Sequence, residues 1–309
     1  MDDYTDCCSV QITETHYGAQ DGRPDLYGVL IPGKRGRLLG SLYTAAGVGP
    51  HPCVVLLHGI PGVERNFDLA QYLRRAGFHV LTFHYSGSWG SDGDYSLAHD
   101  LEDAEAALDF VLSDKEHGFD TSRIYAVGHS LGGFVCGQLT ARRSEIKAGV
   151  LLMPCDIGRV AQLEHENAEV YHVIGEVLDE SAQWLHGTSG TALLREAKEN
   201  ESRFALAAAA SKLAQKPLLC CTGSLDRYTP DEFFCAPLRR AVHEAGGKQL
   251  EHISYPTDHF FADYRLTIAQ SVTEFLSLQA RRPLSFSSLT DPVPRSASRN
   301  FARARCPPR

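Results

Sequence analysis

The sequence predicts an α/β fold in which a mostly parallel sheet carries helices on both faces. From residue 53 onward, short apolar runs rich in β-branched residues alternate with helical patterns, as they do where parallel strands are joined by helical crossovers. Two of these runs end in glycine-bearing loops, at residues 58–62 and 128–132. Between residues 156 and 215 the alternation stops and apolar residues recur at helical spacing, which predicts a helical insertion.

The predicted sheet begins with two strands, at residues 27–31 and 38–44, because apolar residues there flank a turn-rich segment. Residues 53–57 are five apolar residues in a row, which predicts a fully buried strand. Asn66 is then expected to be the N-cap of a helix that runs through Ala76.

A glycine-rich loop follows the next buried strand, which is predicted at residues 79–83. Residues 85–93 are too polar for the core, yet they follow the carboxyl end of that strand, where α/β proteins place their active sites. We expect this loop to line a substrate pocket with Trp89; a plain connection is the alternative. Residues 97–112 then predict an amphipathic helix.

The rest of the chain continues the alternation on either side of the insertion. Strands are predicted up to residue 127 and at residues 148–153, 218–221 and 250–255, and helices at residues 230–245 and 266–278. Pro230 suits the first turn of a helix, where its missing N–H has no intrahelical partner in any case, and Gly246 suits the end of one.

The segment around Ser130 joins a strand to a helix through the pattern Gly-x-Ser-x-Gly, formed with Gly128 and Gly132. A strand that turns sharply into a helix crowds its neighbours, so a Cβ at either glycine would clash. The serine hydroxyl is then exposed at the N-terminus of a helix that begins near Leu131, where free N–H groups and the helix dipole stabilise negative charge. The pattern predicts a nucleophile elbow, with an ordinary strand-to-helix turn as the alternative.

Together with the loop His58-Gly59-Ile60-Pro61-Gly62, this segment resembles the α/β-hydrolase family. The resemblance covers about residues 25–155 and 216–280 and implies an eight-stranded sheet. It also implies an oxyanion hole made by the backbone N–H groups of Ile60 and Leu131.

The family's chain order of nucleophile, acid and histidine is present as well, and the resemblance implies a catalytic triad of Ser130, Asp226 and His259. Asp226 and His259 each follow a predicted strand. The acid would orient the imidazole and stabilise its cation. Asp258 is a rival acid, but a carboxylate adjacent to the histidine in sequence seldom reaches its ring nitrogen, and Asp231 falls inside a predicted helix.

The resemblance divides the chain into a catalytic domain, residues 1–155 and 216–280, and a helical cap, residues 156–215. Trp184 and Phe204 are expected to line the substrate pocket from the cap. The alternative is that the helices of this interval pack away from the site.

Charge is distributed unevenly along the 309 residues. Residues 281–309 contain seven Arg and one Asp, so they carry +6 and the rest of the chain −14 of the net charge of −8. The acidic body is predicted not to bind nucleic acid, and the Pro- and Ser-rich tail is predicted to be disordered. Nine cysteines without C-x-x-C spacing, an acidic N-terminus without a signal pattern and the lack of a long apolar stretch predict a cytoplasmic protein with buried free thiols and no membrane span.

The nucleophile type limits the chemistry. A serine separates the chain from haloalkane dehalogenase and epoxide hydrolase relatives, which attack with aspartate. HExxH, paired CxxC and Walker patterns are missing from the sequence, so no metal or cofactor is expected. We expect a serine hydrolase that cleaves carboxylic esters of small to medium substrates through an acyl-enzyme. A serine aminopeptidase or acyl-peptide hydrolase is the alternative, and a non-catalytic hydrolase-fold binding protein is a third.

Overall fold

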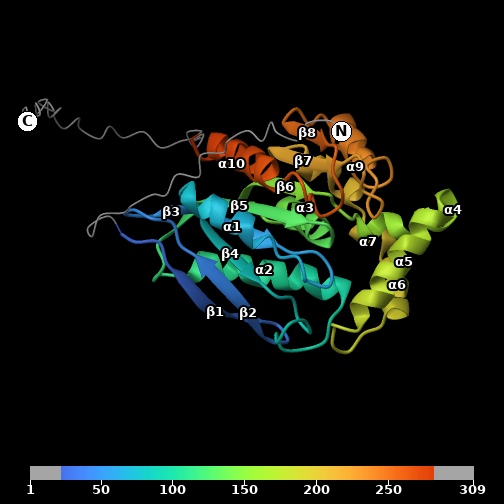
Figure 1. The fold of residues 1–309 in the computed structure, drawn as a ribbon, viewed down its shortest axis with the longest axis horizontal. Helices are drawn as coiled ribbons and strands as arrows, with labels where there is room; N and C mark the ends of the chain where they lie inside the picture. Colours follow the sequence, from blue (N-terminus) through green and yellow to red (C-terminus); the bar gives the residue numbers. More distant parts are fainter. Residues whose placement is uncertain (1–21, 282–309) are drawn as a thin grey trace, which may run out of the picture.

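An eight-stranded sheet runs through the described part of the chain, residues 22–281, in the computed structural model (Figure 1). Its strand order is β1-β2-β4-β3-β5-β6-β7-β8. β2 pairs antiparallel with both β1 and β4, and the other neighbouring strands are parallel. This confirms the predicted mostly parallel α/β-hydrolase sheet. The strands are β1 (Leu26–Gly33), β2 (Gly36–Tyr43), β3 (His51–Leu57), β4 (His79–Phe83), β5 (Phe119–His129), β6 (Ile146–Leu152), β7 (Leu218–Gly223) and β8 (Leu250–Tyr255).

Helices cover both faces of this sheet (Figure 1). α1 (Phe67–Arg75) and α10 (Arg265–Arg281) bury their apolar sides on one face. α2 (Leu97–Ser113), α3 (Leu131–Arg142) and α9 (Cys235–Glu244) do so on the other. The loops that leave the carboxyl ends of the parallel strands therefore gather at one edge of the sheet, where ligands bind in such folds. The predicted tail beyond residue 281 lies outside the described residues.

The helical insertion between β6 and β7 has two parts. α4, α5 and α6 project to one side of the sheet, whereas the elements after them return along α3 (Figure 1). Gln138 of α3 donates a side-chain hydrogen bond to the Phe204 carbonyl at 2.8 Å. The elements are η1 (Ile157–Arg159), α4 (Val160–Glu166), α5 (Ala168–Ala182), α6 (Gly190–Glu199), α7 (Glu201–Phe204), η2 (Leu206–Ala209) and α8 (Ala210–Leu213).

Asp156 closes the base of the insertion. Its buried carboxylate accepts hydrogen bonds from the N–H groups of Gly158 and Leu206, each at 3.1 Å. Burial raises the pKa of Asp156 to about 7, although the bonds from these two N–H groups oppose the shift. One side chain thus holds the first and last parts of the insertion together.

The far end of the insertion is bonded to the sheet domain as well. The Tyr95 N–H donates to the His186 carbonyl at 2.9 Å, and the His186 N–H donates to the Gly87 carbonyl at 2.8 Å. The Glu196 carboxylate on α6 accepts the N–H groups of the first two residues of α2, at 3.0 and 2.9 Å, where a negative charge also complements the helix dipole. The insertion is therefore held at both ends.

Two predicted helix starts differ from the structure. Asn66 does precede α1, but its φ is 54° and its side chain makes no capping bond; its own N–H donates to Glu64 Oε1 at 2.6 Å. α9 begins at Cys235 rather than at Pro230. The residues between them form a turn, in which the carbonyl of residue 231 accepts the N–H of residue 235 at 3.1 Å and that of residue 236 at 2.8 Å; the second spacing, five positions, is wider than that of an α-helix.

The cysteines are as predicted where the structure describes them. The six between residues 22 and 281 are buried and unpaired. In the same range, every helix is too short or too polar to cross a membrane.

Candidate active site

Ser130 lies at the sharp bend between β5 and α3. Its φ is +58°, which side chains seldom adopt, and its N–H donates to the Leu152 carbonyl at 2.9 Å. A Cβ on Gly128 would lie 1.9 Å from the Gly132 carbonyl oxygen, and a Cβ on Gly132 would lie 2.1 Å from the Leu57 carbonyl oxygen. This confirms the predicted steric need for both glycines.

The glycine-bearing loop after β3 packs directly against Ser130. A Cβ on Gly59 would lie 2.9 Å from the Ser130 Cβ, so glycine permits the close approach. Ile60 in this loop and Leu131 at the start of α3 line the same cavity as Ser130. Within residues 22–281, neither of their backbone N–H groups donates a hydrogen bond to a protein acceptor, so both are available to an oxygen atom in the cavity.

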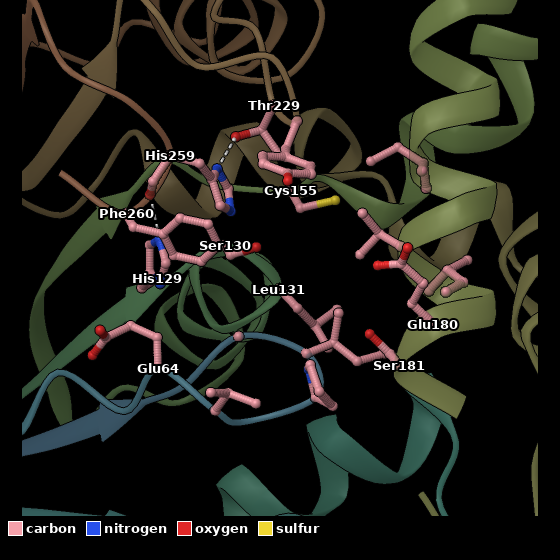
Figure 2. Close-up of a pocket in the computed structure, with 18 of the residues that line it drawn as sticks. Glu64, His129, Ser130, Leu131, Cys155, Glu180, Ser181, Thr229, His259 and Phe260 are labelled. Atoms are coloured by element: carbon pink, nitrogen blue, oxygen red, sulfur yellow. Dashed lines mark hydrogen bonds between the residues drawn. The ribbon is translucent and has the colours of Figure 1, made fainter. Parts of the chain in front are cut away.

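His259 and Asp226 form a buried pair beside Ser130. Asp226 follows β7, His259 follows β8, and Asp226 Oδ2 lies 2.7 Å from His259 Nδ1. Because a carboxylate only accepts, Nδ1 carries the proton of this bond. Figure 2 shows the His259 ring between Thr229 and Ser130, which leaves the other ring nitrogen on the side of the serine.

The Asp226 carboxylate is held in its ionised form. Burial alone would raise the pKa of this carboxyl group, but hydrogen bonds from His259 and Thr229 outweigh burial and lower the pKa below its ordinary value. The carboxylate accepts the N–H groups of Tyr228 at 2.8 Å and of Thr229 at 3.0 Å. A negative charge is therefore fixed next to the imidazole.

The two rival carboxylates lie elsewhere. Asp258 is exposed and accepts the N–H groups of Phe260 and Ala262 at 3.1 and 3.0 Å. Asp231 forms an ion pair with Arg239. Of the three candidates, the structure brings Asp226 to the histidine.

Thr229 is a site residue that the sequence reading missed. Its Oγ1 donates to Asp226 Oδ2 at 2.7 Å and lies 3.3 Å from His259 Nδ1. Its position three residues after the acid was an available signal, since a hydroxyl at this spacing commonly bonds an aspartate within a turn.

His129, the residue before Ser130, holds the loop that carries His259. Its Nε2 lies 2.9 Å from the His259 carbonyl oxygen, which only accepts, so Nε2–H is the donor. Burial and the nearby His259 lower the pKa of His129 to about 3, so this ring is neutral. One side chain thus ties the strand before the serine to the loop of the histidine.

A cavity of about 460 Å³ lies between these residues and the insertion (Figure 2). The loop after β3 lines one side, and α5 lines another through the apolar side chains of Ile174 and Leu178. Further lining residues are Val63, Cys155, Ile157, Val177, Ser181 and Tyr228. The lining of the cavity is therefore mostly apolar.

The charged residues that line this cavity are acidic. Glu64 and Glu180 do so, and among the described residues no Lys or Arg does. Glu64 is paired with Arg265 at 3.4 Å, whereas Glu180 is exposed. As for metals, no group of three His, Cys, Asp or Glu side chains in residues 22–281 could hold an ion.

The three predicted lining residues have different positions. Trp184 lines the cavity. Trp89 does not line it; its indole stacks on Trp184 with ring centroids 5.9 Å apart, and its N–H donates to the Pro61 carbonyl at 2.5 Å. Phe204 is fully buried edge-on against Phe134, away from the cavity, because the last part of the insertion returns along α3. The expectation that Phe204 lines the pocket is therefore wrong.

Comparison with known proteins identifies the family. Residues 54–307 match the alpha/beta hydrolase family, and the chain belongs to it. Over 126 residues, the chain is 33% identical to esterase EstD of Thermotoga maritima. This segment covers 38% of the chain and 30% of EstD, so the match spans about a third of that relative's length.

Solved structures share the fold at low sequence identity. Est1E from Butyrivibrio proteoclasticus, with ferulic acid bound, is similar with a TM-score of 0.65 and 21% identity over 82% of this chain and 100% of Est1E. A puromycin hydrolase is similar with a TM-score of 0.63 and 19% identity over 86% of this chain and 41% of that protein. The chain is thus an alpha/beta hydrolase that has proteins named as esterases among its relatives.

Proposed function

We propose that the protein is a serine hydrolase that cleaves carboxylic esters, with Ser130 as nucleophile, His259 as base and Asp226 as the orienting acid. The observation that carries this proposal is the buried 2.7 Å Asp226–His259 pair beside Ser130 in a shared cavity. Nucleophilic catalysis by serine needs a neutral imidazole whose far nitrogen is held in one orientation, and a fixed carboxylate at Nδ1 supplies this.

In this mechanism, Ser130 Oγ attacks the ester carbonyl carbon while His259 takes the hydroxyl proton. The oxygen of the tetrahedral intermediate accepts hydrogen bonds from the N–H groups of Ile60 and Leu131. The bond to the alcohol then breaks, the alcohol leaves with the proton from His259, and an acyl-serine remains. Water, deprotonated by His259, attacks this ester, and the carboxylic acid leaves as the serine is restored.

Residues 156–215 act in this proposal as a cap that selects the acyl group by size. Support comes from α5, whose Ile174 and Leu178 line the mostly apolar cavity of about 460 Å³. A cavity of this size accepts small to medium substrates. The relative named as an esterase and the ferulic acid bound to Est1E are in keeping with an ester or carboxylic-acid ligand.

An aminopeptidase is the second candidate, because one observation favours it. The exposed Glu180 carboxylate lines the cavity without any Lys or Arg among the described lining residues, and a free α-amino group would be attracted there. A protein named puromycin hydrolase shares the fold.

A panel of nitrophenyl esters of increasing acyl length, compared with aminoacyl anilides, tests both candidates. Ester cleavage with much higher kcat/KM than anilide cleavage supports the esterase, and the reverse supports the peptidase. Labelling by a fluorophosphonate, with Ser130→Ala as the control, tests catalysis itself. A wild-type protein that neither reacts with the probe nor cleaves any substrate would instead be a non-catalytic binding protein.

A further inference from the structure

The Thr229 hydroxyl lies where three loops of the site meet. Its oxygen is 3.1 Å from the Met153 carbonyl oxygen after β6, 2.7 Å from Asp226 Oδ2 after β7 and 3.3 Å from His259 Nδ1 after β8. Figure 2 shows this side chain beside the His259 ring. Thr229 is only 4% exposed, so its contacts are largely shielded from water. The hydroxyl is therefore placed to act on the Asp226–His259 pair.

The Asp226 carboxylate takes the single proton of this hydroxyl. Two oxygen atoms 2.7 Å apart need a proton between them, and the lowered pKa of Asp226 leaves its carboxylate without one. Thr229 is therefore the donor. The Met153 carbonyl oxygen, at 3.1 Å, is more distant and carries no full charge, so it is the weaker acceptor. The bond to Asp226 thus fixes the direction in which the hydroxyl points.

That direction places lone pairs of the Thr229 oxygen next to His259. A hydroxyl that donates its proton to one neighbour still has two lone pairs with which to accept. His259 donates its Nδ1–H to Asp226 Oδ2 at 2.7 Å, and Thr229 Oγ1 is a second, longer acceptor at 3.3 Å (Figure 2). One N–H shared between two acceptors is a known arrangement in proteins. The negative end of the hydroxyl dipole therefore faces this ring nitrogen.

This arrangement favours a positive charge on the His259 ring. In the proposed mechanism the ring becomes a cation when it takes the proton of Ser130. Asp226 then supplies a full negative charge, and Thr229 Oγ1 adds the negative end of a dipole at 3.3 Å. His129, whose ring centroid is 5.0 Å from that of His259, is neutral and does not oppose the charge. Because these groups are buried, their electrostatic interactions are stronger than in water.

We propose that Thr229 is a positioning residue for the acyl transfer. Its hydroxyl donates to Asp226 and, through the lone pairs that this bond directs, holds the Nδ1–H of His259 while the ring is a cation. The proposal rests on the proposed serine hydrolase function and adds a fourth side chain to the Ser-His-Asp set. The effect of Thr229 on the reaction is transmitted through the histidine.

Thr229→Val tests the proposal, because valine has nearly the same shape and lacks the hydroxyl. With a nitrophenyl ester, kcat should fall about tenfold, as expected for the loss of a hydrogen bond to a charged group. KM should change by less than about twofold, because the lost interaction strengthens only when the imidazole is charged. Thr229→Ala should show the same loss, and Thr229→Ser, which keeps the hydroxyl, should restore kcat to within about threefold of the wild type.

Thr82→Val on β4 is the matched control. Thr82 is also buried and donates to the Ser41 carbonyl at 3.3 Å, but it does not line the cavity at Ser130. This variant should keep the kcat of the wild type, and thermal unfolding checks the fold of every variant. If folded Thr229→Val keeps wild-type kcat, or if Thr229→Ser is as slow as Thr229→Val, the hydroxyl has no such role and the proposal is wrong.

Proton NMR of the free protein gives a readout that needs no substrate. The proton of a short, charge-assisted hydrogen bond resonates far downfield. His259→Gln identifies the resonance of Nδ1–H, which is necessary because His117 bonds Asp114 in a similar way at 2.8 Å. Thr229→Val should move this resonance upfield, and Thr229→Ser should leave it near its wild-type position. An unmoved resonance or a downfield shift in Thr229→Val would overturn the proposal, even where the wild type hydrolyses esters.

Discussion

Ser130 is the residue on which the proposed chemistry depends. We expect Ser130→Ala to fold normally but to lose at least ~10³-fold in kcat, because no acyl-enzyme can form while the N–H groups of Ile60 and Leu131 keep some oxyanion stabilisation. Steady-state hydrolysis of a nitrophenyl ester measures the loss, and thermal unfolding monitors the fold. Turnover close to that of the wild type would end the assignment of Ser130 as nucleophile.

The two candidate acids can be separated by a matched pair of substitutions. Asp226→Asn should lower kcat by about 10³–10⁴-fold, because an amide at this place favours the wrong tautomer of His259. Asp258→Asn should change kcat by less than about tenfold, since Asp258 bonds only to N–H groups of its own exposed turn. If Asp258→Asn loses more kcat than Asp226→Asn under identical assay conditions, Asp226 is not the acid that orients His259.

At the level of elements, Asp156 makes the stability of the fold depend on pH. Its pKa is raised to about 7 in the folded protein, so between pH ~4 and ~7 the folded state holds a proton that the unfolded state has released. The contribution of this group to the free energy of unfolding is full below pH ~4 and falls as pH rises through about 7. From pH 5 to 8 the loss is about 3 kcal/mol.

Asp156→Asn removes that titration and keeps an oxygen that can accept from Gly158 and Leu206. Urea unfolding of both proteins should therefore show the variant gaining stability relative to the wild type as pH rises from 5 to 8. A difference between the two proteins that is independent of pH would mean that Asp156 is ionised throughout this range.

The inserted helices contain side chains that line the cavity and side chains that support the core. Ile174→Ala and Leu178→Ala on α5 should raise kcat/KM for long acyl esters relative to short ones. The corresponding change in activation free energy should be at most about 1 to 3 kcal/mol per methylene of the acyl chain. Phe204→Ala should leave that ratio unchanged and lower the free energy of unfolding by about 3–5 kcal/mol, since Phe204 is fully buried against Phe134. Chain-length profiles and urea unfolding of the three variants check both statements; the reverse pattern refutes them.

For the whole molecule, charge should discriminate between substrates. The chain has a net charge of −8, and Glu64 and Glu180 line the cavity. A hemisuccinate ester should therefore react with lower kcat/KM than a neutral ester of the same length, and added salt should reduce the gap by screening. Rates measured from low to about 0.3 M NaCl check this, with the neutral ester as the control. If the difference in kcat/KM between the two esters does not change with salt, electrostatic repulsion is not its cause.

The positions of the strands along the chain and the position of Ser130 were predictable because their causes are local. Five apolar residues in a row require burial, and the steric need for Gly128 and Gly132 follows from the turn itself. The lining of the cavity was not predictable in the same way. Ile174 and Phe204 both lie on apolar helical patterns, and only the path of the chain after α6 decides which one faces the substrate cavity. Likewise, the role of Thr229 depends on where the loops after β7 and β8 meet.

The insertion is attached at its base through Asp156 and at its far end through the bonds of His186 and Glu196. The insertion that contains α5 is therefore held at both ends rather than hinged along one edge. To admit a larger acyl chain, α5 would have to bend between these attachments, and the free-energy cost of bending rises steadily with the size of the chain. Exclusion of oversized acyl chains should therefore be gradual, with each added carbon costing somewhat more than the one before.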